Sequence, residues 1–463
     1  MSGSGPDLEI SRAWLVDTAA AREGPGEIVV RDGILEAVTW LEAGDADGID
    51  AAGVVVAPGF IDLHVHLREP GNEDAETIAS GLAAAAHGGF TSVCAMPNTM
   101  PALDERGVLA GVRAAGEASG SPVELLAIGA VTVGRRGEQL AALGELADAG
   151  VVGFSDDGST VRSAAILRAA LAYAGALGLP IVEHAEESSL TEGAEANDGF
   201  VATVLGLRGW PAAAEEMAVA RDIAILADVV GDVPGARLHL THLSTAGALE
   251  AVRRAKAAGL PVTCDVTPHH LALTDEWIAG ARRWAWEASG DPWADEALVG
   301  QPYEPSLRVN PPLRDPDDAA ACLAALLDGT ADAIATDHAP HTEVDKAIEF
   351  GLAANGISGL ETALGIVLAA VDAGRLPLLR AVAALTTGPA AVIGAATRRA
   401  GSVGLIEGAR ADLVVFDRSD RWTVRADTLV SRGKNSPLLG MDLAGRVLVT
   451  LANGRVAYEA PDS

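Results

Sequence analysis

The sequence predicts an α/β fold: a (β/α)8 TIM-type barrel with a small β-sandwich domain formed by both termini. Eight short apolar runs, rich in β-branched residues, alternate with longer Ala- and Leu-rich stretches whose apolar residues have helical spacing. Both ends of the chain instead contain short strand-like runs separated by turns. Alternating strands and helices imply a parallel sheet, and eight such repeats are the number that closes a barrel.

The eight strand candidates supply the central sheet. They are residues 57–66, 90–98, 123–131, 151–157, 181–186, 238–244, 262–269 and 332–340. Helical patterns occupy the segments between several of them, at 74–87, 138–149, 163–178, 212–230 and 245–258. We therefore expect the barrel to span residues 57–399.

The two ends of the chain are expected to form one further domain. Residues 7–56 and 402–460 contain strand-like runs such as "EIVVRDGILEAVTW" and "GRVLVTLANGRVAYE". Neither end is large enough to bury a core alone. Together, as residues 1–56 and 400–463, they would form a composite β-sandwich beside the barrel.

Composition excludes several classes of function. The chain of 463 residues has 64 acidic and 33 basic residues, a formal charge of −31, which disfavours binding to nucleic acid. No apolar run reaches the ~18 residues of a membrane helix, and the first ten residues do not resemble a signal peptide. The three isolated cysteines form no disulfide framework. We expect a cytoplasmic protein that binds neither nucleic acid nor membrane.

Polar residues gather at the C-terminal ends of the predicted strands, where barrel enzymes place their active sites. They are His64, His66, Asn98, Asp156, Asp157, His184, His242, Asp337 and His338, with His341 just beyond. Each alone is weak evidence, because a buried histidine often has a structural role and "SDDG" often forms a turn. Their recurrence on five strands favours a metal site. Four imidazoles and two carboxylates suit two divalent ions, with zinc as the leading candidate.

Nine motifs extend this pattern along the chain. They are "PGFIDLHVHLREPG", "AMPNT", "FSDDG", "EHAE", "THLS", "CDVTPHHL", "VNPPLR", "TDHAPH" and "GLETALG". As an ordered set spanning nearly the whole chain, they resemble dihydroorotase of the long bacterial type, in the amidohydrolase superfamily. The resemblance implies reversible interconversion of N-carbamoyl-L-aspartate and L-dihydroorotate in de novo pyrimidine synthesis.

The resemblance also implies a set of metal ligands. His64, His66 and Asp337 would hold the first zinc ion, and His184 and His242 the second. The bridging carboxylate of the family matches Asp157, with Asp156 as a competitor, because only one of two adjacent strand side chains can face inward. Many relatives bridge their metals with a carboxylated lysine, but no lysine lies near this strand.

A carboxylate clamp and a set of ring contacts are implied as well. Arg68, Asn98 and His341 match the family's clamp for the substrate carboxylate, and a guanidinium suits that bidentate geometry. Asn310, and the backbone at Asn355 and Gly356, match its contacts to the pyrimidine ring, and His66 lies beside the same substrate. Taken alone, Arg68 could equally form a surface salt bridge and Asn98 a turn.

The implied mechanism uses a hydroxide shared by the two zinc ions, which attacks the ring carbonyl. Asp337 would act as general base and then as general acid, first taking the proton and then giving it to the leaving amide nitrogen. The same steps in reverse would cyclise carbamoyl aspartate.

Two rival functions and one unusual segment remain open. Another cyclic amidase, such as a hydantoinase, dihydropyrimidinase or allantoinase, would share the barrel and the metals. A non-catalytic scaffold for aspartate carbamoyltransferase would be expected to have lost metal ligands.

The segment near 277–303 carries Trp277, Trp284, Trp286 and Trp293. It could pack a small core of its own, or contact another subunit or cover the active site. A homodimer or higher oligomer, and a complex with that carbamoyltransferase, are the expected partners.

Overall fold

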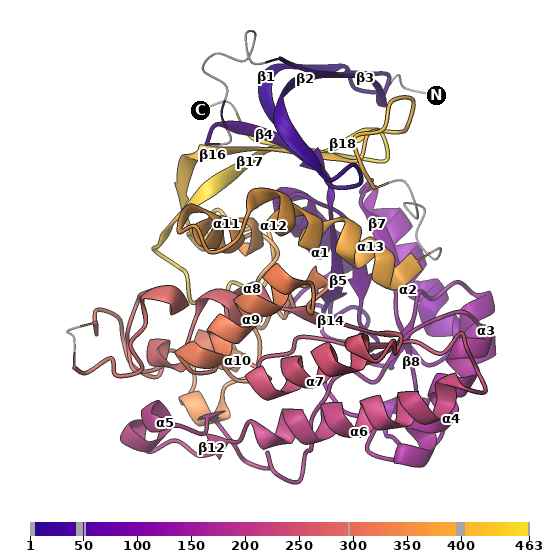
Figure 1. Cartoon of the computed structure of the whole chain (residues 1–463), viewed down its shortest axis with the longest axis vertical. Helices are drawn as coiled ribbons and strands as arrows, with labels where there is room; N and C mark the ends of the chain where they lie inside the picture. The colour runs from indigo at the N-terminus through magenta and orange to yellow at the C-terminus, as the bar shows by residue number, and fades with distance from the viewer. Residues whose placement is uncertain (1–4, 43–49, 51, 295–296, 395–402, 462–463) are drawn as a thin grey trace.

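A computed structural model describes residues 5–42, 50, 52–294, 297–394 and 403–461. Figure 1 shows two parts: a sheet that joins the two ends of the chain, and below it a larger part in which helices surround parallel strands. The mixed α/β character is as predicted. None of the helices within the described ranges has the length and apolar character of a membrane span.

The terminal sheet has seven strands in the order β18-β17-β16-β4-β1-β2-β3. Their bounds are β1 Leu8–Asp17, β2 Arg22–Arg31, β3 Ile34–Trp40, β4 Val54–Pro58, β16 Leu413–Thr423, β17 Asp442–Ala452 and β18 Arg455–Glu459. β4 joins the two ends, since it pairs in parallel with β1 and antiparallel with β16. Leu15, Ile28 and Val56 share a buried cluster with Leu413 and Leu451. Both ends therefore share one sheet and one core, while a two-layer sandwich stays a prediction.

All eight predicted barrel segments contain a parallel strand. The bounds are β5 Phe60–Val65, β6 Phe90–Ala95, β7 Glu124–Ala127 with β8 Gly129–Ala130, β9 Phe154–Ser155, β10 Ile181–Glu183, β13 Leu238–Leu240, β14 Val262–Val266 and β15 Ala333–Ile334. They form two sheets, β5-β6-β7 and β15-β14-β13-β10-β9-β8. A parallel bridge pairs Val65, the last residue of β5, with His338, which lies just beyond β15. Closure into one barrel stays a prediction that this bridge supports.

The first predicted strand, 57–66, is two strands in different sheets. β4 ends at Pro58 in the terminal sheet, and β5 begins at Phe60 among the parallel strands. Gly59 lies between them, and a Cβ there would come within 2.2 Å of the Thr91 side chain. The expected domain boundary at 56/57 thus falls inside β4, while the second, at 399/400, lies outside the described residues. The division itself stays a prediction.

Helices occupy the segments between the strands. Those of five or more residues are α1 Ile78–His87, α2 Arg106–Ser119, α3 Leu143–Asp148, α4 Ala164–Ala176, α5 Phe200–Leu205, α6 Ala213–Val230, α7 Ala246–Ala257, α8 Pro268–Ala272, α9 Pro316–Asp328, α11 Ala363–Asp372, α12 Leu378–Leu385 and α13 Thr387–Ile393. Local sequence fixes several starts: Thr77 and Ser80 form a capping box at α1, and Asp315 caps α9 ahead of Pro316. A short helix, α10 Glu343–Lys346, follows the last parallel strand.

The tryptophan-rich segment does not pack a core of its own. Trp277 is fully buried in the main hydrophobic cluster, and Trp284 and Trp286 pack against that cluster. Trp293 is exposed and meets Phe200 edge to face, with ring centroids 5.6 Å apart. The small-core interpretation is therefore wrong. A contact with another subunit stays a prediction.

Candidate active site

Six side chains converge at the C-terminal ends of the parallel strands; we call them the floor of the site. They are His64, His66, Asp157, His184, His242 and Asp337, and all six are buried. The Nε2 atoms of His64 and His66 lie 3.2 Å apart, and Nδ1 of His184 lies 3.0 Å from Nε2 of His242. Asp337 Oδ1 is 3.0 Å from His66 Nε2. The floor thus presents imidazole nitrogens and carboxylate oxygens to one small volume.

Asp157, rather than Asp156, faces the other floor residues. Its Oδ2 lies 3.2 Å from His64 Nε2, and its Oδ1 lies 3.5 Å from both His184 Nδ1 and His242 Nε2. Asp156 turns the other way and accepts hydrogen bonds from the backbone and hydroxyl of Thr132. His338 also points away, because its ring contacts Glu76 and the backbone at Gly359.

Hydrogen bonds to Nδ1, on the side of the ring away from the floor, orient the imidazoles of His64 and His66. His64 Nδ1 lies 2.8 Å from the hydroxyl of Thr241, and His66 Nδ1 lies 2.9 Å from the side-chain oxygen of Asn98. Each of these rings therefore turns Nε2 toward the floor. Such partners orient the histidines of metal sites. His242 and Asp337 themselves have positive φ, 43° and 48°, a strained conformation for non-glycine residues that is concentrated at functional sites.

The charges of the floor favour a bound cation. Burial lowers the pKa of His64, but Asp157 and Asp337 outweigh that effect and raise it to about 9. Burial likewise opposes ionisation of Asp157, yet the facing imidazoles hold its pKa well below the ordinary value. Asp157 Oδ1 is buried without a hydrogen-bond donor in the part of the chain that the structure describes. A buried carboxylate oxygen in this position requires a positive partner.

Two overlapping groups of floor residues could each hold a metal ion. In one, ligand atoms of His64, Asp157 and His242 all lie within 4.8 Å of one another; in the other, those of His64, His66 and Asp337 do. Imidazole and carboxylate together are a donor set that zinc prefers. The residues present therefore fit a metal.

A cavity of about 170 Å³ opens above the floor, and six of its other lining residues form what we call the rim. The rim comprises Arg68, Asn98, Asn310, His341, Asn355 and Gly356. Every substrate-contact residue expected from the sequence thus lies at this cavity. The rim comes from several loops that lie far apart in the chain.

Arg68 has an unusual environment. Its Nε donates to Pro340 O at 3.1 Å, and its Nη2 lies 3.2 Å from His341 Nε2. The same His341 nitrogen lies 2.8 Å from Asn355 O, which can only accept, so that nitrogen carries its proton and cannot accept from Arg68. Among the described residues, no carboxylate forms an ion pair with Arg68. Its guanidinium therefore lines the cavity without an anionic partner among the described residues.

Other rim residues are held by backbone contacts. Gly356 has φ 144°, and a Cβ there would come within 2.6 Å of Ala339 O, so this position requires glycine. Asn435 holds the same loops, because its amide donates to Ala339 O and Gly356 O. Burial, with the nearby Arg68, lowers the pKa of His341 to about 4, so that its ring is neutral near pH 7.

Sequence reasoning missed Glu186, which contacts both the floor and the rim. Its Oε2 lies 3.0 Å from His184 Nε2 and 3.0 Å from Asn310 Nδ2. Its position two residues after His184 in "EHAE" was the available signal, since alternate residues of an extended segment share a side.

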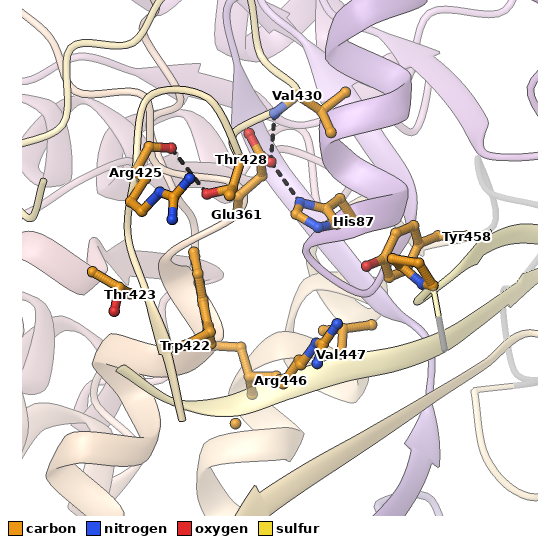
Figure 2. Close-up of a pocket in the computed structure, with 13 residues that line it drawn as sticks. His87, Glu361, Trp422, Thr423, Arg425, Thr428, Val430, Arg446, Val447 and Tyr458 are labelled. Atoms are coloured by element: carbon orange, nitrogen blue, oxygen red, sulfur yellow. Dashed lines mark hydrogen bonds and ion pairs between the residues drawn. The ribbon is translucent and has the colours of Figure 1, made fainter. Parts of the chain in front are cut away.

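A second and larger cavity lies where the terminal sheet meets α1 and α11 (Figure 2). It measures about 500 Å³ and is lined by Trp422, Arg446 and Val447 on one side. In its polar part, Glu361 accepts from the backbone of Val430 and lies 2.5 Å from His87 Nδ1. These polar groups bond to one another rather than converging on an open volume. Size alone therefore does not identify the reactive site.

Comparison with known proteins agrees with this geometry. Residues 53–247 match the family model described as dihydro-orotase-like. A dihydroorotase of Anaeromyxobacter dehalogenans is 46% identical over 98% of both chains, and one of Pelotomaculum thermopropionicum is 42% identical, again over 98% of both. The chain belongs to the dihydroorotase family.

Solved structures support the fold. The L-hydantoinase of Arthrobacter aurescens superimposes with a TM-score of 0.79 at 24% identity, over 98% of this chain and 97% of that one. The dihydropyrimidinase of Brevibacillus agri gives 0.74 at 23% identity, over 98% and 95%. This dihydroorotase-family chain therefore has the architecture of cyclic amide hydrolases, and its own residues must indicate its substrate.

Proposed function

We propose that this chain catalyses the reversible interconversion of N-carbamoyl-L-aspartate and L-dihydroorotate in pyrimidine synthesis. The family supports the reaction class, and Arg68 carries the choice of substrate. A guanidinium that lines the cavity and forms no ion pair with any described carboxylate fits a ring that bears its own carboxylate. Burial lowers the pKa of Arg68, which is the cost of keeping a cation there without an anion.

We further propose that two zinc ions occupy the floor. His64, His66 and Asp337 would hold one, His184 and His242 the other, and Asp157 would lie between them. When bound, the ions would supply an activated water and polarise the amide carbonyl. The buried Oδ1 of Asp157, which has no hydrogen-bond donor among the described residues, and the convergence of imidazole nitrogens support this assignment.

Asp337 is the proposed proton carrier. Burial opposes its ionisation, but His64 and His66 outweigh that effect and lower its pKa, so the carboxylate carries no proton of its own at neutral pH. Asp337 also lines the cavity, where the amide nitrogen of the ring would lie. In hydrolysis it would take a proton from the attacking water and pass it to the leaving nitrogen, and in cyclisation the transfer reverses.

The rim would bind and orient the substrate. Arg68, Asn98 and His341 would hold its carboxylate, while Asn310 and the backbone at Asn355 and Gly356 would contact the ring amide groups. All of them line the same cavity as the floor residues. Holding the ring at several points places its reacting carbonyl above the floor, which is a large part of catalysis for an unactivated amide.

The two rival functions make different demands on these residues. A hydantoinase, dihydropyrimidinase or allantoinase would share the floor, but its uncharged ring would leave Arg68 without a partner. A scaffold for aspartate carbamoyltransferase would need neither floor nor rim, whereas the described structure holds both in place. We also propose a closed barrel, a homo-oligomer able to bind that carbamoyltransferase, and a cytoplasmic location.

One assay tests the proposal. Zinc-loaded protein is supplied with N-carbamoyl-L-aspartate, and separately with dihydroorotate, dihydrouracil and hydantoin, and ring closure or opening is followed by absorbance. We expect turnover of the first two only. Efficient hydrolysis of dihydrouracil or hydantoin instead would establish a rival amidase, and turnover of none of the four would favour the scaffold.

A further inference from the structure

Glu186 connects the floor to the rim. It lies two residues beyond the floor histidine His184, just after β10, and one of its carboxylate oxygens, Oε2, meets two partners. These are His184 Nε2 and Asn310 Nδ2, each at 3.0 Å. The other oxygen, Oε1, accepts from the hydroxyl of Thr191. One carboxylate therefore joins the stretch 184–191 to the distant Asn310.

These contacts determine which nitrogen of His184 faces the floor. A carboxylate only accepts hydrogen bonds, so His184 Nε2 must carry a proton in this contact. In the neutral ring the lone pair then lies on Nδ1, the atom that approaches Asp157 and His242. A carboxylate behind a histidine in this way fixes its tautomer and raises its basicity toward a metal.

The same oxygen determines how Asn310 is presented. Because the side-chain nitrogen of Asn310 donates to Glu186, its carbonyl oxygen is left to face other partners, and Asn310 lines the cavity. Three donors, on His184, Thr191 and Asn310, therefore converge on this one carboxylate.

We propose that Glu186 is a positioning residue that sets two groups at once: the Nδ1 lone pair of His184 toward the metal centre, and the carbonyl of Asn310 toward the substrate ring. Metal affinity and substrate affinity would then depend on one shared carboxylate. The second half of this proposal rests on the proposed function; the first half does not.

The test compares Glu186→Gln with Glu187→Gln. Glu187 is the next residue, and its side chain contacts only Ser189 among the hydrogen bonds of the described chain, so it controls for loss of a charge at this place. Metal affinity is measured without substrate, by competition for zinc with a chromogenic chelator. We expect Glu186→Gln to weaken the binding of one zinc ion about 10- to 100-fold, as such changes typically do, and Glu187→Gln to change it less than twofold.

The second measurement separates positioning from a general loss of structure. With zinc saturating, KM and kcat for dihydroorotate are measured for Glu186→Gln, Asn310→Ala and the double variant. We expect KM to rise severalfold in each single variant, and the double variant to be no worse than the poorer single one, because both remove the same contact. Glu186→Asp, which retains a shorter carboxylate, serves if the glutamine variant does not fold, and should recover part of the zinc affinity.

The results distinguish three claims: the role of Glu186 toward the metal, its role toward Asn310, and the proposed function. Unchanged zinc affinity in Glu186→Gln, with only a lower melting temperature, would show a structural role and overturn the proposal. Weaker zinc binding with additive effects on KM would overturn the shared positioning. If the wild-type protein turns over no dihydroorotate, the proposed function fails, while the chelator competition still decides the role of Glu186 toward the metal.

Discussion

The floor and the rim of the site are built in different ways. Floor side chains leave the ends of parallel strands, and groups behind them, such as Thr241 and Asn98, fix their orientation. Rim residues lie on loops and depend on contacts between loops, such as those of Asn435. The floor supplies chemistry that any cyclic amidase could use, whereas the rim supplies Arg68, a guanidinium that forms no ion pair with any described carboxylate. Reaction class and substrate choice therefore belong to different parts of the molecule.

Removing the metal from the floor should reduce turnover more than any of the substitutions described below. We expect dialysis against a strong chelator to abolish turnover, because no described side chain can replace the activated water, and added zinc to restore it. Thermal unfolding should also shift to lower temperature, since bound metal stabilises the folded state. Metal content and kcat are measured on the same samples. Full turnover by metal-free protein would contradict the assignment of the floor.

Replacing the proton carrier should have the next largest effect. Asp337→Asn retains the size of the side chain but cannot accept a proton, so kcat should fall by about 10²- to 10⁴-fold. The KM for dihydroorotate should change far less, because Arg68 and Asn310 remain. Steady-state kinetics on zinc-loaded variant protein measures both. A kcat within tenfold of wild type would show that another group carries the proton.

Weakening the support of the rim should have a smaller effect. Lys346 Nζ donates to the backbone oxygens of Pro305 and Ala354, which belong to the loops that carry Asn310 and Asn355. Lys346→Met should lower the free energy of unfolding by about 1–3 kcal/mol and raise KM severalfold with little change in kcat. Chemical denaturation and kinetics measure these quantities.

Lys256→Met is the matched control for that variant. Lys256 pairs with Asp332; both side chains are partly buried, and neither lines the cavity. It should change KM less than twofold. If both lysine variants raised KM equally, the support of the rim would not be specific to Lys346.

The sequence predicted the floor residues better than it predicted the residues that hold them in place. Position at strand ends grouped His64, His66, His184, His242 and Asp337, but it grouped Asn98, Asp156 and His338 with them, and only the family resemblance separated the expected ligands from these. The choice between Asp157 and Asp156 needed the structure, because neighbouring strand residues face opposite ways and their order depends on where the strand begins. Thr132, which holds Asp156 away from the floor, is 24 residues distant in sequence.

Features that depend on long-range packing were harder to predict. At the break between β4 and β5, Gly59 lies against Thr91 of β6, and Trp277 is buried in a cluster drawn from many parts of the chain. Glu186 was missed because its second partner, Asn310, is 124 residues away. Local patterns identify which residues share a strand face, but they do not reveal which loops meet.

The central claim is that Arg68 selects a substrate with a carboxylate. Its direct test is the ratio of kcat/KM for a ring with the carboxylate to kcat/KM for the same ring without it. Values of kcat/KM are measured for dihydroorotate and for dihydrouracil, the same ring without the carboxylate, in the wild-type protein and in Arg68→Met. A charged hydrogen bond contributes about 1.5–3 kcal/mol, so we expect kcat/KM for dihydroorotate to fall about 10- to 150-fold. The rate with dihydrouracil, already low, should hardly change. An equal fall for both rings, or none for dihydroorotate, would contradict the account.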